Sequence, residues 1–229
     1  MRKIQRLAAI GAMAALTVAL GACGAAETPA STTSESSSAA APSSSASAAP
    51  TAAAASGSGV TEISDIFGPA CSQVPPEGEG SAQGMVDDPV ATAASNNPLL
   101  STLATAVGAA NLGDTLNSSK ALTVYAPYNG AFDEVKAALG DEAFTALLAN
   151  PTDLGAILSY HVVGSRMDAE QLVAAGSTTQ LAGGNVTVGG SADAPTFTGG
   201  DGNAATTLCG NIPTANATVF VIDKVLMAG

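Results

Sequence analysis

Apolar residues recur at spacings of three and four through the middle of the chain, and this spacing predicts helices with one buried face. Leu99, Leu103 and Val107 follow the pattern after Asn97 and Pro98, which suit the N-cap and the first position of a helix. The same reasoning predicts helices over residues 89–94, 97–110, 129–139, 141–148, 151–159 and 168–175.

Shorter runs rich in β-branched residues predict strands. They cover residues 121–126, 178–181, 185–188, 196–198 and 218–226. Gly183 and Gly184 suit a hairpin turn between two of these runs. Residues 60–86 contain several glycine and proline breakers and predict an irregular leader. Helices followed by antiparallel strands predict an α+β domain, with the helices on one side of a sheet or sandwich.

The beginning of the chain has the pattern of a secretory signal peptide. Arg2, Lys3 and Arg6 precede an apolar stretch over residues 7–22, which is shorter than the roughly 20 residues that a membrane-spanning helix needs. The end of this stretch, with Cys23, resembles the lipobox of bacterial lipoproteins. This resemblance implies cleavage before Cys23 and acylation of that cysteine. The alternative is an ordinary secreted protein whose signal peptide ends near a cysteine.

The composition changes abruptly after Cys23. Residues 24–59 contain no aromatic or large aliphatic side chain and consist mainly of Ala, Ser, Thr and Pro. Such a segment buries no core, so the sequence predicts a disordered linker over residues 23–59, with a root-mean-square reach of about 30–36 Å. The remaining residues 60–229 suit a single domain.

The chain contains three cysteines. If Cys23 carries lipid, Cys71 and Cys209 remain as a pair, and in an oxidising compartment outside the cytoplasm such a pair forms a disulfide. The alternative is metal binding by these two cysteines together with His161, the only histidine. Two thiols and one distant imidazole fall short of the four ligands of a structural zinc site. We therefore expect a disulfide and no bound metal.

The chain is acidic, with a formal net charge of −12. Cleavage before Cys23 removes three of its seven basic residues, and the other four are scattered singly. Without a basic cluster to displace counterions from phosphates, nucleic acid is not an expected partner. Attachment to an anionic membrane surface then has to come from the lipid rather than from a basic patch.

The motifs that carry a recognisable catalytic mechanism are absent from the sequence. It holds no G-x-S-x-G, no H-E-x-x-H and no P-loop. Adjacent acids such as Asp87 and Asp88 suit helix ends, where negative charge is favourable. The simplest interpretation of His161 is a structural ring at the end of a helix. The sequence therefore predicts neither an enzyme nor a cofactor.

Three segments resemble conserved elements of the fasciclin family. Residues 122–132 (LTVYAPYNGAF) resemble its first box, residues 160–163 (YHVV) its central Tyr-His element, and residues 211–226 (NIPTANATVFVIDKVL) its terminal box. The resemblance covers about residues 85–227 and implies a fasciclin-like fold, an antiparallel strand sandwich with helices along one side and edge. The terminal box departs from many members of the family, because residues 216–220 lack their glycine and histidine.

Further segments resemble the actinobacterial branch of this family, the secreted and lipidated surface antigens of mycobacterial type, including their cysteine pair. These segments are residues 68–71 (GPAC), 88–91 (DPVA), 95–98 (SNNP), 209–210 (CG) and 214–218 (TANAT). Within the boxes, Asn129 suits the cap of the helix that follows Pro127. Asp223 interrupts an apolar run and suits an acceptor of backbone or hydroxyl hydrogen bonds.

The resemblance implies a monomeric, non-enzymatic lipoprotein, anchored to the cell membrane through Cys23 and exposed at the cell surface or in the envelope. Such a protein presents its fasciclin domain for adhesion to extracellular matrix or cell-surface proteins. In animal fasciclin proteins the Tyr-His region is linked to adhesion, which makes Tyr160 and His161 candidate contact residues. The alternative is a module that binds a lipid or another apolar small molecule in a groove between the helices and the sheet.

Overall fold

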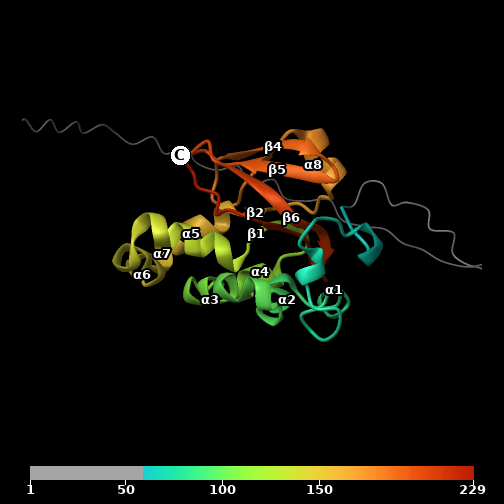
Figure 1. Ribbon diagram of the computed structural model, residues 1–229, viewed down its shortest axis with the longest axis horizontal. Helices are drawn as coiled ribbons and strands as arrows, with labels where there is room; N and C mark the ends of the chain where they lie inside the picture. The colour runs from blue at the N-terminus through green and yellow to red at the C-terminus, as the bar shows by residue number, and fades with distance from the viewer. Residues whose placement is uncertain (1–58) are drawn as a thin grey trace, which may run out of the picture. The chain divides into compact units, whose positions relative to one another are not determined.

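The computed structural model describes residues 59–229 (Figure 1). The predicted signal peptide (residues 1–22), Cys23 and the predicted linker up to residue 58 lie outside the described residues. The helical elements are η1 (Ile63–Asp65), η2 (Cys71–Gln73), α1 (Ala82–Met85), α2 (Val90–Asn96), η3 (Pro98–Leu100), α3 (Ser101–Ala109), α4 (Gly113–Ser118), α5 (Asn129–Leu139), α6 (Asp141–Leu148), α7 (Pro151–Tyr160) and α8 (Ala169–Ala175). The strands are β1 (Leu122–Pro127), β2 (Val162–Val163), β3 (Ser177–Thr179), β4 (Asn185–Ser191), β5 (Ala194–Thr198), β6 (Ala204–Pro213) and β7 (Ala217–Ile222).

The strands form a seven-stranded sheet in the order β2-β1-β7-β6-β5-β4-β3. Neighbours are antiparallel except for β1 and β7, which run parallel. The two edge strands approach each other, because Val163 and Gln180 form a bridge and the N–H of Leu181 donates to the carbonyl of Val162 at 2.8 Å. The sheet therefore closes almost completely into a barrel-like sandwich, and the predicted α+β class is confirmed.

β6 carries the chain from one half of this sandwich to the other. Residues 204–206 pair with β5, whereas residues 207–213 pair with β7. Two register shifts interrupt the second pairing, and Asn211, in the same segment, has a φ of 56°, which is uncommon for a residue other than glycine. Bulges of this kind let one strand bend between two packed sheets. The hydrophobic pattern did not predict β6, since its Ala, Thr, Gly and Asn residues break the period.

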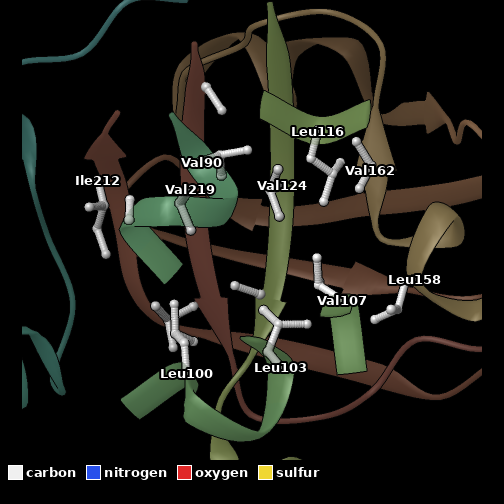
Figure 2. Packing of buried hydrophobic residues seen from close by; sticks show 14 of the residues in the cluster. Val90, Leu100, Leu103, Val107, Leu116, Val124, Leu158, Val162, Ile212 and Val219 are labelled. Carbon is white, nitrogen blue, oxygen red and sulfur yellow. The ribbon is translucent and has the colours of Figure 1, made fainter. Parts of the chain in front are cut away.

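Two apolar cores lie on opposite faces of the sheet. The larger core fills the space between the sheet and the helices, and Figure 2 shows side chains of β1 and β7, including Val124 and Val219, in one layer with Leu103 of α3. The second core fills the inside of the sandwich, where the ring of Phe197 lies 4.2 Å from that of Tyr125 and 5.8 Å from that of Phe220. β1 and β7 are buried on both faces, which explains their continuous apolar sequences.

The helices are divided between the two sides of the sheet. α2 to α7 gather on one side, and α8 lies on the other, beside β4 and β5 (Figure 1). Leu172 of α8 is fully buried in the inner core. The ends of α8 are well defined, because Asp168 and Gln171 form a capping box and Gly176 has the left-handed conformation that commonly ends a helix.

Asparagine side chains from other parts of the chain cap α2. The Oδ1 of Asn216, in the turn between β6 and β7, accepts the N–H of Val90 at the start of α2 at 2.9 Å, and its Nδ2 donates to the carbonyls of Leu116 and Ser119 at 2.8 Å each. Asn117 accepts the next N–H of α2, that of Ala91, at 2.9 Å. These bonds satisfy backbone groups that a helix terminus leaves unpaired.

The prediction that Asn129 caps the helix after Pro127 is wrong, because Asn129 caps a different helix. The N-cap of α5 is Tyr128, without a side-chain bond, and Asn129 is the first residue of the helix. Its Oδ1 instead accepts the N–H of Thr102 at 3.0 Å, and its Nδ2 donates to the carbonyl of Pro98 at 2.9 Å. Asn129 therefore caps α3, a helix that precedes it in the chain, and attaches α3 to the end of β1.

Replacement of Asn216 by alanine is expected to lower the free energy of unfolding by about 2–4 kcal/mol, because it leaves one buried donor and two carbonyls without their partner. Urea denaturation followed by circular dichroism measures this loss. Asn203→Ala is the matched control, since Asn203 is exposed and bonds only within its own turn. Equal stability of the two variants would contradict the proposed role of Asn216.

Candidate functional site

Tyr160, one of the two predicted contact residues, is buried where α7 ends. It is 2% exposed, its hydroxyl donates to the carbonyl of Asn185 at 2.9 Å, and the same oxygen accepts the N–H of Gly200 at 3.0 Å. The side chain thus joins the end of α7 to β4 and to the turn that follows β5. The phenol works as a structural link between three segments.

His161 is also 2% exposed, and both of its ring nitrogens have partners. Nδ1 lies 2.8 Å from the carbonyl of Ile157, and Nε2 accepts the N–H of Leu226 at 2.8 Å. A carbonyl only accepts, so Nδ1 carries the proton and the ring is neutral. Burial lowers the pKa of His161 from 6.5 to about 4, and its bond to Ile157 opposes this only in part. The ring fastens the segment after β7 to the end of α7.

The prediction of a contact patch made by Tyr160 and His161 is therefore corrected. Both side chains point into the domain, and each uses its polar atoms on backbone groups of this chain. Their burial depends on residues 185, 200 and 226, which lie far along the sequence. The geometry of His161 agrees with the other interpretation, that of a structural ring at the end of a helix.

A chain of polar side chains crosses the inner core near the place where the sandwich closes. The hydroxyl of Tyr125 lies 3.0 Å from Oγ1 of Thr178, which accepts from Nε2 of Gln180 at 2.8 Å. Burial raises the pKa of Tyr125, so the phenol stays protonated. The Oε1 of Gln180 is buried without a hydrogen-bond partner among residues 59–229. This leaves an unsatisfied acceptor beside the closing strands.

The structure joins Cys71 to Cys209 in a disulfide with a Cα–Cα distance of 5.0 Å. The leader also pairs with β6 through its backbone, since Phe67 and Gly210 exchange hydrogen bonds of 3.3 and 2.8 Å. Gly210 leaves room for the ring of Phe67, which a Cβ at this position would overlap and force to move. The leader thus covers the edge of β6 in the region where β5 no longer pairs with it, and an exposed strand edge is avoided.

Asp223 has the role that the sequence predicts. Its Oδ1 accepts the N–H of Thr206 at 2.7 Å and its Oδ2 accepts the hydroxyl of the same residue at 2.6 Å. The carboxylate is half-buried at the end of β7 and holds β6 beside it. Both oxygens serve structure, which leaves no carboxylate here for a ligand.

Residues 59–229 contain no group of three or more His, Cys, Asp or Glu residues placed to hold a metal ion. Within the same residues, no helix is both long enough and apolar enough to span a membrane.

Two small, partly open apolar cavities lie on the helical side of the sheet, each about 20 Å³. One is bounded by α5, α6 and α7, with Phe132, Phe144 and His161 in its wall. The other lies under α2 and α3, against Val124 of β1. Each has room for one or two water molecules, so neither holds an apolar ligand in this conformation. An open groove of about 430 Å³ lies between β2 and β3, where the sandwich is not fully closed.

The comparisons with known proteins agree with this architecture. A family model described as "Fasciclin domain" matches residues 98–228. "Immunogenic protein MPB70" of Mycobacterium bovis is 43% identical over 171 residues, which cover 71% of this chain and 82% of that protein. "Cell surface glycolipoprotein MPB83" of the same organism is 42% identical over 172 residues, which cover 72% of this chain and 73% of that protein. The chain belongs to the fasciclin-domain family.

The fold also matches a solved structure of a FAS1 domain pair from the insect cell adhesion molecule Fasciclin I. The TM-score is 0.54 at 15% sequence identity, and the match covers 63% of this chain and 52% of that chain. This chain therefore spans about half the length of the insect pair. At this identity the likeness concerns the fold alone.

Acidification is expected to destabilise the domain through His161. Because the pKa of His161 in the folded protein is about 4, below its ordinary 6.5, the unfolded chain binds the proton more readily between these values. The contribution of neutral His161 to the free energy of unfolding is complete above about pH 6.5, and it falls by about 3 kcal/mol as the pH drops to about 4. Urea denaturation across this range measures the slope. His161→Gln is expected to flatten it, and an unchanged slope in that variant would contradict this assignment.

Removal of the disulfide by the double change Cys71→Ser and Cys209→Ser is expected to lower the free energy of unfolding. The two cysteines are 138 residues apart, and for a loop of this length the chain-entropy model gives about 5 kcal/mol. Denaturation with and without a reductant measures the effect. The Cys23→Ala variant is the control, since its disulfide remains. A loss below about 1 kcal/mol would show that the backbone pairing of Phe67 with Gly210 is enough to hold the leader.

Proposed function

We propose that this protein is a non-enzymatic lipoprotein, anchored at Cys23, that displays its fasciclin domain at the cell surface for adhesion to matrix or envelope proteins. The observation that carries the proposal is the 42% identity to a protein named a cell surface glycolipoprotein, over 72% of this chain. The lipobox-like end of the predicted signal peptide supplies the anchor, and residues 24–59 supply a spacer between membrane and domain.

The chemistry of the domain favours binding over catalysis. Its only histidine is buried, neutral and bonded at both nitrogens, so it is not placed for proton transfer to a substrate. The carboxylate of Asp223 is bonded to Thr206. A reaction would need at least one accessible group with a matched partner, and binding needs only a complementary surface.

The surface of the domain favours weak contacts made in many copies. The chain has three tyrosines and no tryptophan, and Tyr125 and Tyr160 are buried, which leaves Tyr128 half-buried as the remaining one. Aromatic anchors dominate tight protein interfaces, so a surface poor in them is suited to low affinity. Many tethered domains on one cell raise the effective concentration and convert weak contacts into firm attachment.

The alternative, a module for a lipid or another apolar small molecule, has less support. Binding sites for such ligands usually enclose about 300–1,000 Å³. The two apolar cavities between helices and sheet are each about 20 Å³. A lipid would have to displace α6 or α2 before it could enter. Adhesion therefore remains the function that this domain supports best.

The anchor and the adhesion are tested with one substitution. Cys23→Ala is expected to abolish acyl labelling, to move the protein from the membrane fraction to the medium and to reduce attachment of cells to immobilised matrix proteins. The released protein is expected to inhibit attachment of wild-type cells, because its domain is intact. Cys71→Ala is the control for acyl labelling alone, since that cysteine is not the proposed acylation site and its loss also removes the disulfide to Cys209.

Several results would contradict these expectations. Acyl labelling that persists in Cys23→Ala would refute the anchor. Attachment that is the same in wild-type and Cys23→Ala cells would refute adhesion by this protein. Native mass spectrometry of the released protein adds a separate measurement. A stoichiometric bound lipid, together with no saturable binding to matrix proteins, would favour the alternative function.

A further inference from the structure

The place where the sandwich closes is formed by two strand edges that meet only briefly. Directly after β3, the N–H of Gln180 donates to the carbonyl of Gly184, the residue before β4, at 3.1 Å. Alternate residues of a strand direct their backbone groups to opposite sides, so Ser177, Thr179 and Leu181 face away from β4. Leu181 confirms this direction, since its N–H donates to Val162 of β2.

The two edges separate beyond this contact. Val163 and Gln180 form the bridge, but the residues after Val163 are not paired with those before Gln180. The open groove of about 430 Å³ occupies the gap. Its lining comes from the β2 side and from β3 in nearly equal parts and comprises Val163, Gly164, Ser165, Met167, Ser177, Thr178, Thr179 and Leu181.

The groove presents backbone groups that match an extended chain. The N–H groups of Ser177 and Thr179 point towards it and donate no hydrogen bond to any of residues 59–229. They repeat every second residue, which is the spacing at which an added strand offers its carbonyls. A lipid tail has no such acceptors, and a small ion would satisfy only one of the two groups.

The side chains of the groove set the character of its occupant. None of the lining residues is charged, and most are small. Leu181 is 51% exposed, although it is large and apolar. Gln180, beside the groove, donates to Thr178 and keeps an unsatisfied buried acceptor, Oε1. An uncharged segment with small side chains therefore fits the walls, and its apolar positions gain from contact with Leu181.

We propose that the groove between β2 and β3 binds an extended, uncharged polypeptide segment of a partner protein by strand addition to the free edge of β3. The proposal deepens the adhesive function proposed above and rests on it for the existence of a protein partner. The affinity comes mainly from backbone hydrogen bonds, so the groove accepts many sequences that share an extended conformation. This agrees with a surface that lacks aromatic anchors.

Two substitutions at one position separate backbone from side-chain recognition. Thr179→Pro removes the N–H that faces the groove and fills the space with the proline ring, while the pairing with β4 keeps its bonds through Thr178 and Gln180. Thr179→Val keeps the N–H and removes the hydroxyl. Circular dichroism and thermal denaturation establish that both variants are folded. Ser177→Pro repeats the test at the second N–H if Thr179→Pro fails to fold.

The experiment uses the full chain in its released Cys23→Ala form and a phage-displayed library of random dodecapeptides as the probe. A peptide enriched on this protein is synthesised, and its Kd is measured by fluorescence anisotropy. Thr179→Pro is expected to weaken binding by at least about tenfold and Thr179→Val by less than about twofold. The peptide is also expected to slow amide hydrogen exchange at Ser177 and Thr179.

Each other outcome overturns the inference. These outcomes are no enriched peptide, equal weakening by Thr179→Pro and Thr179→Val, or unchanged exchange at the two amides. Protection of both amides without added peptide would show that the groove is filled by this chain itself, or, if the protection rises with protein concentration, by a second copy. Cell adhesion that persists in Thr179→Pro would contradict the role of the groove but not the proposed adhesive function. Peptide binding without cell adhesion would contradict the adhesive function but not peptide binding in the groove.

Discussion

The need to satisfy buried backbone groups at helix ends determines how this domain is assembled. The helical half consists of short elements, and the structure satisfies the backbone groups at several of their termini with amides from other parts of the chain. Asn216 is the clearest case, because one buried side chain joins α2, α4 and the turn before β7. Loss of this side chain leaves three backbone groups without a hydrogen-bond partner, whereas loss of an apolar contact of similar size affects only its immediate neighbours.

The other polar side chains inside the domain likewise bond to backbone groups of distant segments. Tyr160 and His161 stand at the end of α7 and bond to backbone groups of three later segments. Asp223 does the same for β6. The polar atoms of these residues are thus used by the fold. The groups left unpaired in residues 59–229 include the backbone amides at the edge of β3 and the buried Oε1 of Gln180. Groups available to a binding partner therefore lie at the strand edges and on the surface of the domain.

The sequence predicts local elements well where one period persists. The helix predicted over residues 129–139 matches α5, and the run that becomes β1 is recognisable because both of its faces are buried. β6 escapes prediction, since it changes partner and bends at Asn211. The target of Asn129 and the burial of His161 depend on contacts across long stretches of chain. The groove beside β3 lies where two strand edges separate, and this separation leaves no mark in the amino-acid pattern.

The parallel pairing of β1 with β7 also bears on the order in which the domain folds. β7 is the last strand of the chain, yet it lies between β1 and β6 in the middle of the sheet. Neither core is complete until these final residues are present, and pairings so distant in sequence form slowly. A nascent chain is therefore unable to complete its fold while its C-terminal end is still being made. For the exported lipoprotein proposed above, this delay would keep the chain unfolded, and so competent for export, until its synthesis is complete.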